Sequence, residues 1–141
     1  MYLDSAYIAK YYLNEFDAEA VRGLILGADS LVSSEWSLLE VTCAFHRHLR
    51  ESHLTAAQYR ELSKAFRKHV EDGLWTLIPI NGRLLARVGA ALDSLSPRVF
   101  LRSGDAVQLV SAQEVGESEI WTNDRRMLAA APYFGLVGRS A

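Results

Sequence analysis

The sequence lacks the features that mark secreted, membrane-spanning and disordered proteins. It contains one cysteine in 141 residues, Cys43, which excludes an internal disulfide and is typical of a reducing compartment. It has no signal-peptide pattern and no apolar run long enough to cross a membrane. Repeats, low-complexity tracts and Pro/Gly/Ser-rich linkers are also missing. We therefore expect a single domain over residues 1–141 that acts in the cytoplasm, with no membrane partner.

The chain also lacks a large excess of charge of one sign. Fifteen Lys and Arg against seventeen Asp and Glu give a net charge of −2, so the total does not indicate a nucleic-acid-binding protein. Half of the residues are hydrophobic, which argues against disorder. The basic residues are nevertheless uneven, with one run over residues 46–53 and another over 60–69. We interpret both runs as exposed faces of helices.

Alternating short apolar runs and helical patterns predict a parallel sheet covered on both faces. The strands are expected over residues 2–4, 30–33, 74–78, 119–122 and 133–137. The helices are expected over residues 6–14, 18–26, 35–51, 55–72, 81–95, 104–114 and from 123 to Pro132. In the longest apolar helix, the stripe that faces the core is expected to contain Leu38, Val41, Phe45 and Leu49.

Three aspartates stand at the junctions between predicted elements. Asp4 and Asp124 each follow a strand and precede a helix, and Asp105 begins a helix. Any one of them is explained as an ordinary helix cap, which stabilises by about 1 kcal/mol. In a parallel sheet, however, the carboxyl ends of the strands meet at one edge, where such folds bind their ligands. We therefore expect the three carboxylates to lie close together.

Glu40 is the residue that helix capping does not explain. It lies inside the predicted helix 35–51 among apolar neighbours such as Leu39 and Val41. A buried carboxylate without a partner costs several kcal/mol. Two ordinary explanations remain, a glutamate facing solvent and one paired with Arg47. We favour a third, in which Glu40 joins the three aspartates around a metal ion or its water.

The residue types at this edge indicate the kind of metal. An all-oxygen set suits Mg²⁺ or Mn²⁺, and the Cys/His spacing of a zinc site is missing. Such an ion lowers the pKa of a bound water and stabilises a departing oxygen, which suits phosphodiester hydrolysis. Arg102 and Arg125 flank the aspartates and are interpreted as tentative substrate contacts through phosphate, with solvated surface charge as the alternative.

Four short stretches, in this order, resemble the PIN-domain family, and specifically the VapC-type toxins of toxin–antitoxin pairs. They are Asp4-Ser5-Ala6-Tyr7, Ser37-Leu38-Leu39-Glu40, Ser103-Gly104-Asp105-Ala106 and Thr122-Asn123-Asp124. The resemblance covers essentially the whole chain. It implies a three-layer α/β/α sandwich with a parallel sheet, and ribonuclease activity that depends on Mg²⁺ or Mn²⁺.

The resemblance also assigns roles to residues and names partners. It implies that Asp4, Glu40, Asp105 and Asp124 are the catalytic, metal-binding quartet. Ser5, Thr122 and Asn123 would be supporting groups that orient a carboxylate or a water. The implied partners are an RNA substrate, a cognate antitoxin protein and a second copy of the chain in a homodimer.

Two other functions compete with a ribonuclease. An aspartyl-phosphate phosphatase would need a second acid two residues after Asp4, where this chain has Ala6. A non-catalytic PIN-like module that binds RNA or protein stays open. The presence of Asp4, Glu40 and Asp105 argues against it, because a module that binds no metal gains nothing from clustered negative charge. Stabilisation by Mn²⁺ would distinguish the enzyme from the module.

Overall fold

The computed structural model describes all residues, 1–141, and contains one five-stranded parallel sheet. The strands are β1 (Tyr2–Leu3), β2 (Val32–Ser34), β3 (Thr76–Ile78), β4 (Glu119–Trp121) and β5 (Val137–Arg139). Their order across the sheet is β3-β2-β1-β4-β5, and every neighbouring pair is parallel. The chain therefore begins at the centre of the sheet and builds outward on both sides. The predicted parallel α/β arrangement is confirmed.

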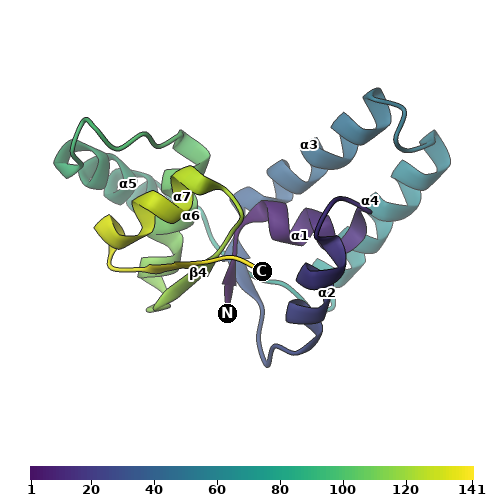
Figure 1. Ribbon diagram of the computed structural model, residues 1–141, viewed down its shortest axis with the longest axis horizontal. Coiled ribbons are helices and arrows are strands. Elements are labelled where there is room, and N and C mark those ends of the chain that lie inside the picture. The colour runs from purple at the N-terminus through teal and green to yellow at the C-terminus, as the bar shows by residue number, and fades with distance from the viewer.

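The helices form two groups on the two sides of the sheet (Figure 1). One group is α1 (Ser5–Tyr12), α2 (Ala18–Leu26), α3 (Trp36–Arg50) and α4 (Ala56–Glu71). The other is α5 (Gly82–Ser94), α6 (Ser103–Glu114) and α7 (Arg125–Ala130), which continues into the 3-10 turn η1 (Ala131–Phe134). The expected three-layer α/β/α sandwich is thus confirmed.

Two hydrophobic cores lie on opposite faces of the sheet, and β1 supplies a side chain to each. Tyr2 packs into the core formed with α5, α6 and α7, whereas Leu3 packs into the core formed with α1 to α4. Successive side chains of a strand point to opposite faces, so two adjacent apolar residues are buried when a sheet is covered on both sides. Both side chains are fully buried.

Helix α3 buries a different stripe from the one that the sequence predicts. Val41 and Phe45 are buried as expected, but Leu38 is 39% exposed and Ser37 is buried in its place. The hydroxyl groups of Ser37 and Ser33 lie 2.7 Å apart, which joins the start of α3 to β2 by a hydrogen bond. Leu38, the next residue along the helix, consequently faces away from the core.

The last strand also differs from its prediction. Strand β5 covers Val137–Arg139, whereas residues 133 and 134, expected to be extended, belong to η1. Pro132 was expected to end helical structure, but it lies in the first turn of η1, where a missing N–H breaks no hydrogen bond. Gly135, at φ +68°, ends this turn instead.

Helices α3 and α4 run outward together from the body of the molecule (Figure 1). We call their outer part, residues 46–62, the arm. No residue of the arm is buried. The arm's α4 begins with a capping box, in which the Thr55 hydroxyl accepts from Gln58 N and the Gln58 side chain accepts from Thr55 N. None of the helices is both long enough and apolar enough to pass through a lipid bilayer.

Candidate active site

Four carboxylates gather at the carboxyl end of the sheet, beside its central strand. Asp4 follows β1 directly, and the run Thr122-Asn123-Asp124 follows β4. These strands are neighbours, with Leu3 opposite Trp121. Asp105 comes from the first turn of α6, and Glu40 from α3. We call the side chains of Asp4, Glu40, Asp105 and Asp124 the acidic centre.

Asp4 is the most enclosed member of the acidic centre, with 4% of its surface exposed. Its carboxylate accepts hydrogen bonds from the backbone N–H of Tyr7, at 3.0 Å, and from the hydroxyl of Thr122. Burial raises the pKa of Asp4 to about 6; the bonds from Thr122 and Tyr7 oppose this rise, and the charge of Glu40 adds to it. The ionised carboxylate of Asp4 is therefore destabilised at this position unless a cation lies beside it.

Glu40 is half-buried and has polar partners but no cationic one. Its Oε2 accepts from Ser5 Oγ at 2.6 Å and from Gln108 Nε2 at 3.2 Å. The alternative pairing with Arg47 is not formed, because that guanidinium lies 3.7 Å from Glu15. Glu40 is thus fixed beside Asp4 and does not point into bulk solvent.

Arg102 connects the other two acids. Its Nε and Nη2 donate to the two carboxylate oxygens of Asp105, at 2.8 and 3.1 Å, in a bidentate pair. The same Nη2 donates to Asp124 Oδ2 at 2.7 Å. The hydrogen bonds to Asp105 and its charge raise the pKa of Arg102, and the charges of Asp124 and Glu40 add to this rise.

The three predicted supporting residues make different contacts. Ser5 holds Glu40, as described above. The hydroxyl of Thr122 donates to Asp4 and accepts from the backbone N–H of Asp124, so it links two acids. Asn123 makes no bond to the acidic centre: it accepts from the Tyr7 hydroxyl at 2.7 Å and donates to Asp17 at 2.6 Å. Asn123 therefore stabilises the loop that precedes α2.

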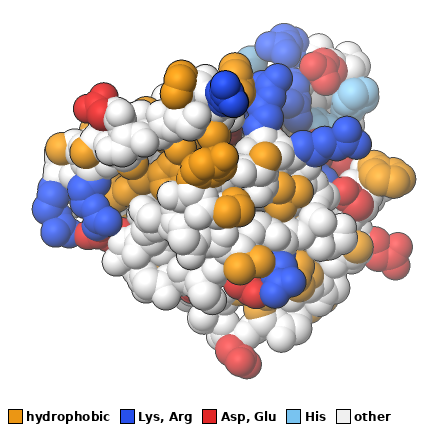
Figure 2. Space-filling view, turned by 60° about the vertical axis from the view of Figure 1, so that its left-hand side comes forward, with side chains coloured by type: hydrophobic (Ala, Val, Ile, Leu, Met, Phe, Trp, Pro, Cys, Tyr) orange, Lys and Arg blue, Asp and Glu red, His pale blue; other side chains and the backbone are white.

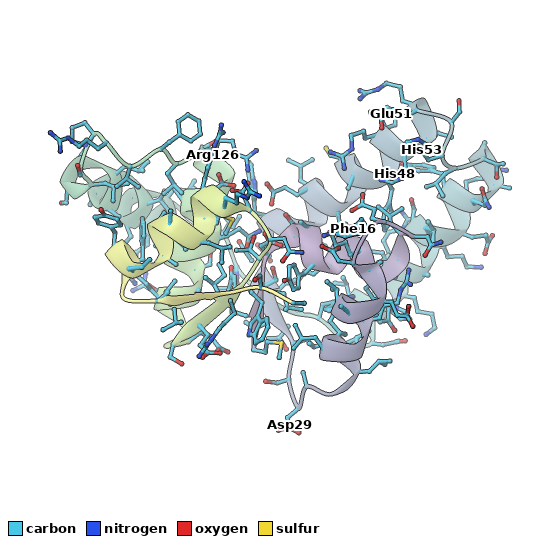
Figure 3. The ribbon with its side chains drawn as sticks, viewed as in Figure 1. Phe16, Asp29, His48, Glu51, His53 and Arg126 are labelled. Atoms are coloured by element: carbon cyan, nitrogen blue, oxygen red, sulfur yellow. The ribbon has the colours of Figure 1, made fainter.

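Among the predicted substrate contacts, only Arg102 lies within the acidic centre. Arg125 is exposed at the start of α7, where its side chain makes no hydrogen bond or ion pair. Its neighbour Arg126 lies over the ring of Phe100, with 4.1 Å between the guanidinium carbon and the ring centroid. Figure 3 labels Arg126 at this end of α7, on the side of the molecule opposite the arm.

Gln108 was not predicted from the sequence, although its side chain positions Glu40. It is 1% exposed, in a stretch of α6 in which every residue from Asp105 to Ala112 is buried. Its Oε1 accepts from the Tyr2 hydroxyl at 2.8 Å, and its Nε2 donates to Ser37 and Glu40. One signal was available, a glutamine between Val107 and Leu109 in an otherwise apolar run.

Two hollows in the surface meet at the acidic centre. One, of about 320 Å³, is lined by Trp36, Leu39, Cys43, Ser103, Gly104 and Asp105, together with Glu40 and Arg102. The other, of about 240 Å³, is lined by Ser5, Ala6, Ala9, Glu15, Ala44 and Arg47, again with Glu40 and Arg102. A larger hollow of about 860 Å³ lies under the arm and contains none of the four acids. Its Phe16, His48 and His53 are labelled in Figure 3, away from α5 to α7.

The acidic centre suits Mg²⁺ or Mn²⁺ in the chemistry of its donors. Four carboxylates share a single bonded guanidinium, and the most buried of them has a raised pKa. Hard divalent cations prefer such oxygen ligands. As the side chains stand, no three Asp, Glu, His or Cys groups are close enough together to hold an ion. Asp105 and Asp124 are instead both bonded to Arg102.

Comparisons with known proteins identify the family of this chain and agree with its fold. The model of the family described as PIN domain matches residues 1–132. Among solved structures, the crystal structure of VapC20 from Mycobacterium tuberculosis, a sarcin–ricin loop cleaving toxin, is similar with a TM-score of 0.72. The two sequences are 13% identical over 92% of this chain and 93% of that one. No protein in a search of curated sequences matches.

Proposed function

Because this chain belongs to the PIN-domain family, we propose that it is a metal-dependent endoribonuclease and the toxin of a toxin–antitoxin pair. One observation carries the proposal: the four acids come from four separate segments of the chain, lie at the same end of the sheet, and are each oriented by specific hydrogen bonds. A protein that only binds a partner has no use for an arrangement that repels itself. We further propose that the enzyme acts in the cytoplasm.

The chain's own residues account for the binding of the ion and of the scissile phosphate. Asp4, Glu40, Asp105 and Asp124 would hold Mg²⁺ or Mn²⁺, and the ion would supply an activated water and neutralise charge on the departing oxygen. Thr122 and Ser5 keep Asp4 and Glu40 in place through their hydroxyl groups. Asp4 is enclosed, so it is available only to a ligand within the centre.

RNA is the proposed substrate, and basic side chains near the acidic centre support this. Arg102 and Arg47 line the hollow of about 240 Å³ together with Glu40. Figure 2 shows further Lys and Arg side chains gathered along the upper edge of the molecule. Arginine binds phosphate oxygens with two parallel hydrogen bonds, which suits an RNA backbone laid across this edge.

We also propose two protein partners, a cognate antitoxin and a second copy of the chain. Exposed apolar side chains support them, since the chain shows several large ones outside its cores. Figure 2 shows such side chains gathered on the surface of the α5–α7 side. In and after α5 they are Leu85, Leu92 and Phe100, which are 50%, 39% and 58% exposed. Apolar patches of this kind are typical of surfaces that bind other proteins.

The activity is tested with purified protein and single-stranded or hairpin RNA in the presence of Mn²⁺ or Mg²⁺. The wild-type chain should cleave, EDTA should stop cleavage, and Asp4→Asn and Asp105→Asn should each be inactive while still folded. Asp29→Asn, an exposed aspartate far from the acidic centre, is the matched control and should keep full activity (Figure 3). Full activity of either variant at the centre would dispose of the catalytic assignment.

The toxin role needs a separate experiment in growing cells. Expression of the wild-type chain without a partner should arrest growth, and Asp4→Asn should not. Sequencing RNA ends after induction would identify the cleaved RNA. Normal growth with wild-type protein at the same level would leave the nuclease proposal standing and remove the toxin proposal.

A further inference from the structure

The guanidinium of Arg102 occupies the position at the acidic centre in which a metal ion would bind. Its guanidinium is bonded to both oxygens of Asp105 and to Oδ2 of Asp124. Those two acids come from different segments, 19 positions apart in the chain, and Arg102 is the cation that joins them. A bidentate guanidinium uses the same carboxylate lone pairs that coordinate a cation.

The side chain of Arg102 is also free to leave. It is 55% exposed, whereas the Asp105 side chain beneath it is 9% exposed. The Arg102 backbone N–H donates to Asp105 at 3.3 Å, so the residue remains attached to the start of α6 when its side chain moves. The guanidinium makes no other hydrogen bond in the protein and is more than half exposed, which lowers the cost of its displacement.

The position of Arg102 between the two hollows shows what its movement would change. Arg102 and Glu40 line both hollows, and Glu40 is fixed by Ser5 and Gln108. Arg102 is therefore the movable part of the wall between them. An outward movement of its side chain would therefore change the lining of both hollows at once.

We propose that Arg102 is an internal counter-ion of the metal-free enzyme, which a divalent cation displaces from Asp105 and Asp124 and which then binds a substrate phosphate. The proposal rests on the proposed metal-dependent nuclease function. It assigns Arg102 two alternating partners, the carboxylates without metal and the RNA backbone with metal. It also explains why Asp105 and Asp124 stay together in the absence of an ion.

The test measures the concentration of Mn²⁺ that gives half of the maximal thermal stabilisation. We expect Arg102→Gln to lower this concentration about tenfold, because the ion no longer competes with a hydrogen-bonded guanidinium. Arg125→Gln is the matched control: it removes the same charge next to Asp124, but Arg125 makes no bond there, so the shift should be less than about twofold. Equal shifts in the two variants, or no shift in Arg102→Gln, would overturn the proposal.

A second measurement uses the wild-type chain and does not depend on how a variant folds. The Nε–H resonance of Arg102 should exchange slowly with solvent in EDTA and become fast on addition of Mg²⁺, since its bond to Asp105 is lost. An unchanged resonance in an enzyme that binds Mg²⁺ would contradict the displacement. Should neither Mn²⁺ nor Mg²⁺ stabilise the wild-type protein at all, the proposed nuclease function itself would fall, so the two failures are distinguishable.

Discussion

At the scale of single residues, Asp4 shows how a buried carboxylate weakens the fold that carries it. Its pKa is about 6 in the folded chain against 3.8 for the free side chain, chiefly because of burial. The folded state therefore binds the proton more tightly than the unfolded state does. Stability from this group is highest below about pH 4 and falls as the pH rises through 6.

The change Asp4→Asn should consequently stabilise the metal-free protein at pH 7–8, by about 2–3 kcal/mol. At pH 3 the two proteins should differ little, because Asp4 is then mostly protonated in both states. Urea unfolding in EDTA across this range measures the difference. Asp29→Asn provides the baseline for an exposed aspartate. A gap between wild type and Asp4→Asn that narrows as the pH rises would contradict the sign argued here.

Gln108 shows the opposite case, a polar residue that the fold needs. The change Gln108→Leu removes the acceptor of the buried Tyr2 hydroxyl and a donor to Glu40, and should cost about 1–3 kcal/mol in the free energy of unfolding. Adding Tyr2→Phe removes the stranded hydroxyl, so the double variant should lose less than the sum of the single ones. Chemical denaturation of all four proteins tests this, and strict additivity would show that Gln108 and Tyr2 act independently.

The sequence predicted the acids of the centre, but it did not predict how they are bonded. Asp4 and Asp124 could be placed because a residue at the end of a parallel strand lies at a known edge. The hydrogen bonds that join Arg102 to Asp105 and Asp124 could not be predicted, because the direction of a long side chain depends on packing that no local sequence pattern encodes. Asn123 was expected to orient a group of the acidic centre, but its side chain bonds Tyr7 and Asp17 instead. These contacts could not be predicted for the same reason.

At the scale of elements, the acidic centre depends on how closely α6 approaches α3. A Cβ atom added to Gly104 would lie 2.7 Å from Glu40 Oε1 and 2.8 Å from Trp36 Nε1, both closer than real contacts allow. A side chain at this position would therefore require the side chains of Glu40 and Trp36 to move. The missing side chain at Gly104 therefore lets the first turn of α6 lie directly against the side chain of Glu40.

The change Gly104→Ala should reduce RNA cleavage about ten- to a hundredfold, because Glu40 must shift away from the new methyl group. Stability should change by less than about 1 kcal/mol, since alanine favours the helix and the displaced atoms belong to side chains. Gly89→Ala in α5, where nothing lies within 4 Å, is the control and should be active and slightly more stable. Unchanged cleavage in Gly104→Ala would show that the position of Glu40 is not critical.

Local patterns predicted the elements well wherever a cap or a stop was of the ordinary kind. Thr55 begins α4 with its capping box, and Gly73, at φ +78°, follows its end, as the sequence indicated. Pro132 was misleading, because a proline that usually ends a helix here starts a 3-10 turn and moves the last strand to Val137–Arg139. The exposed Leu38 was unforeseen because Ser37 is buried against Gln108, a partner that is distant in sequence.

At the scale of the whole molecule, stability is divided unevenly between the body and the arm. Every residue of α6 from Asp105 to Ala112 is buried, whereas no residue of the arm is. A segment with few buried contacts opens locally at a lower free energy than the global unfolding. Figure 1 shows the arm standing out from the sheet, and only the half-buried Leu54, Tyr59 and Leu62 of the arm pack against a core, so its opening exposes little buried surface.

Amide hydrogen exchange should therefore give arm protection factors at least about a hundredfold below those of α6. Thr55→Ala removes the hydroxyl that caps α4 and should weaken the arm by about 1 kcal/mol, lowering its protection about fivefold while α6 is unchanged. Residue-resolved exchange by NMR measures both segments in one sample. Equal losses of protection in the arm and in α6 would mean that the molecule opens only as a whole, and that the arm is stabilised by its contacts with the core under α1 to α4 rather than by its own cap.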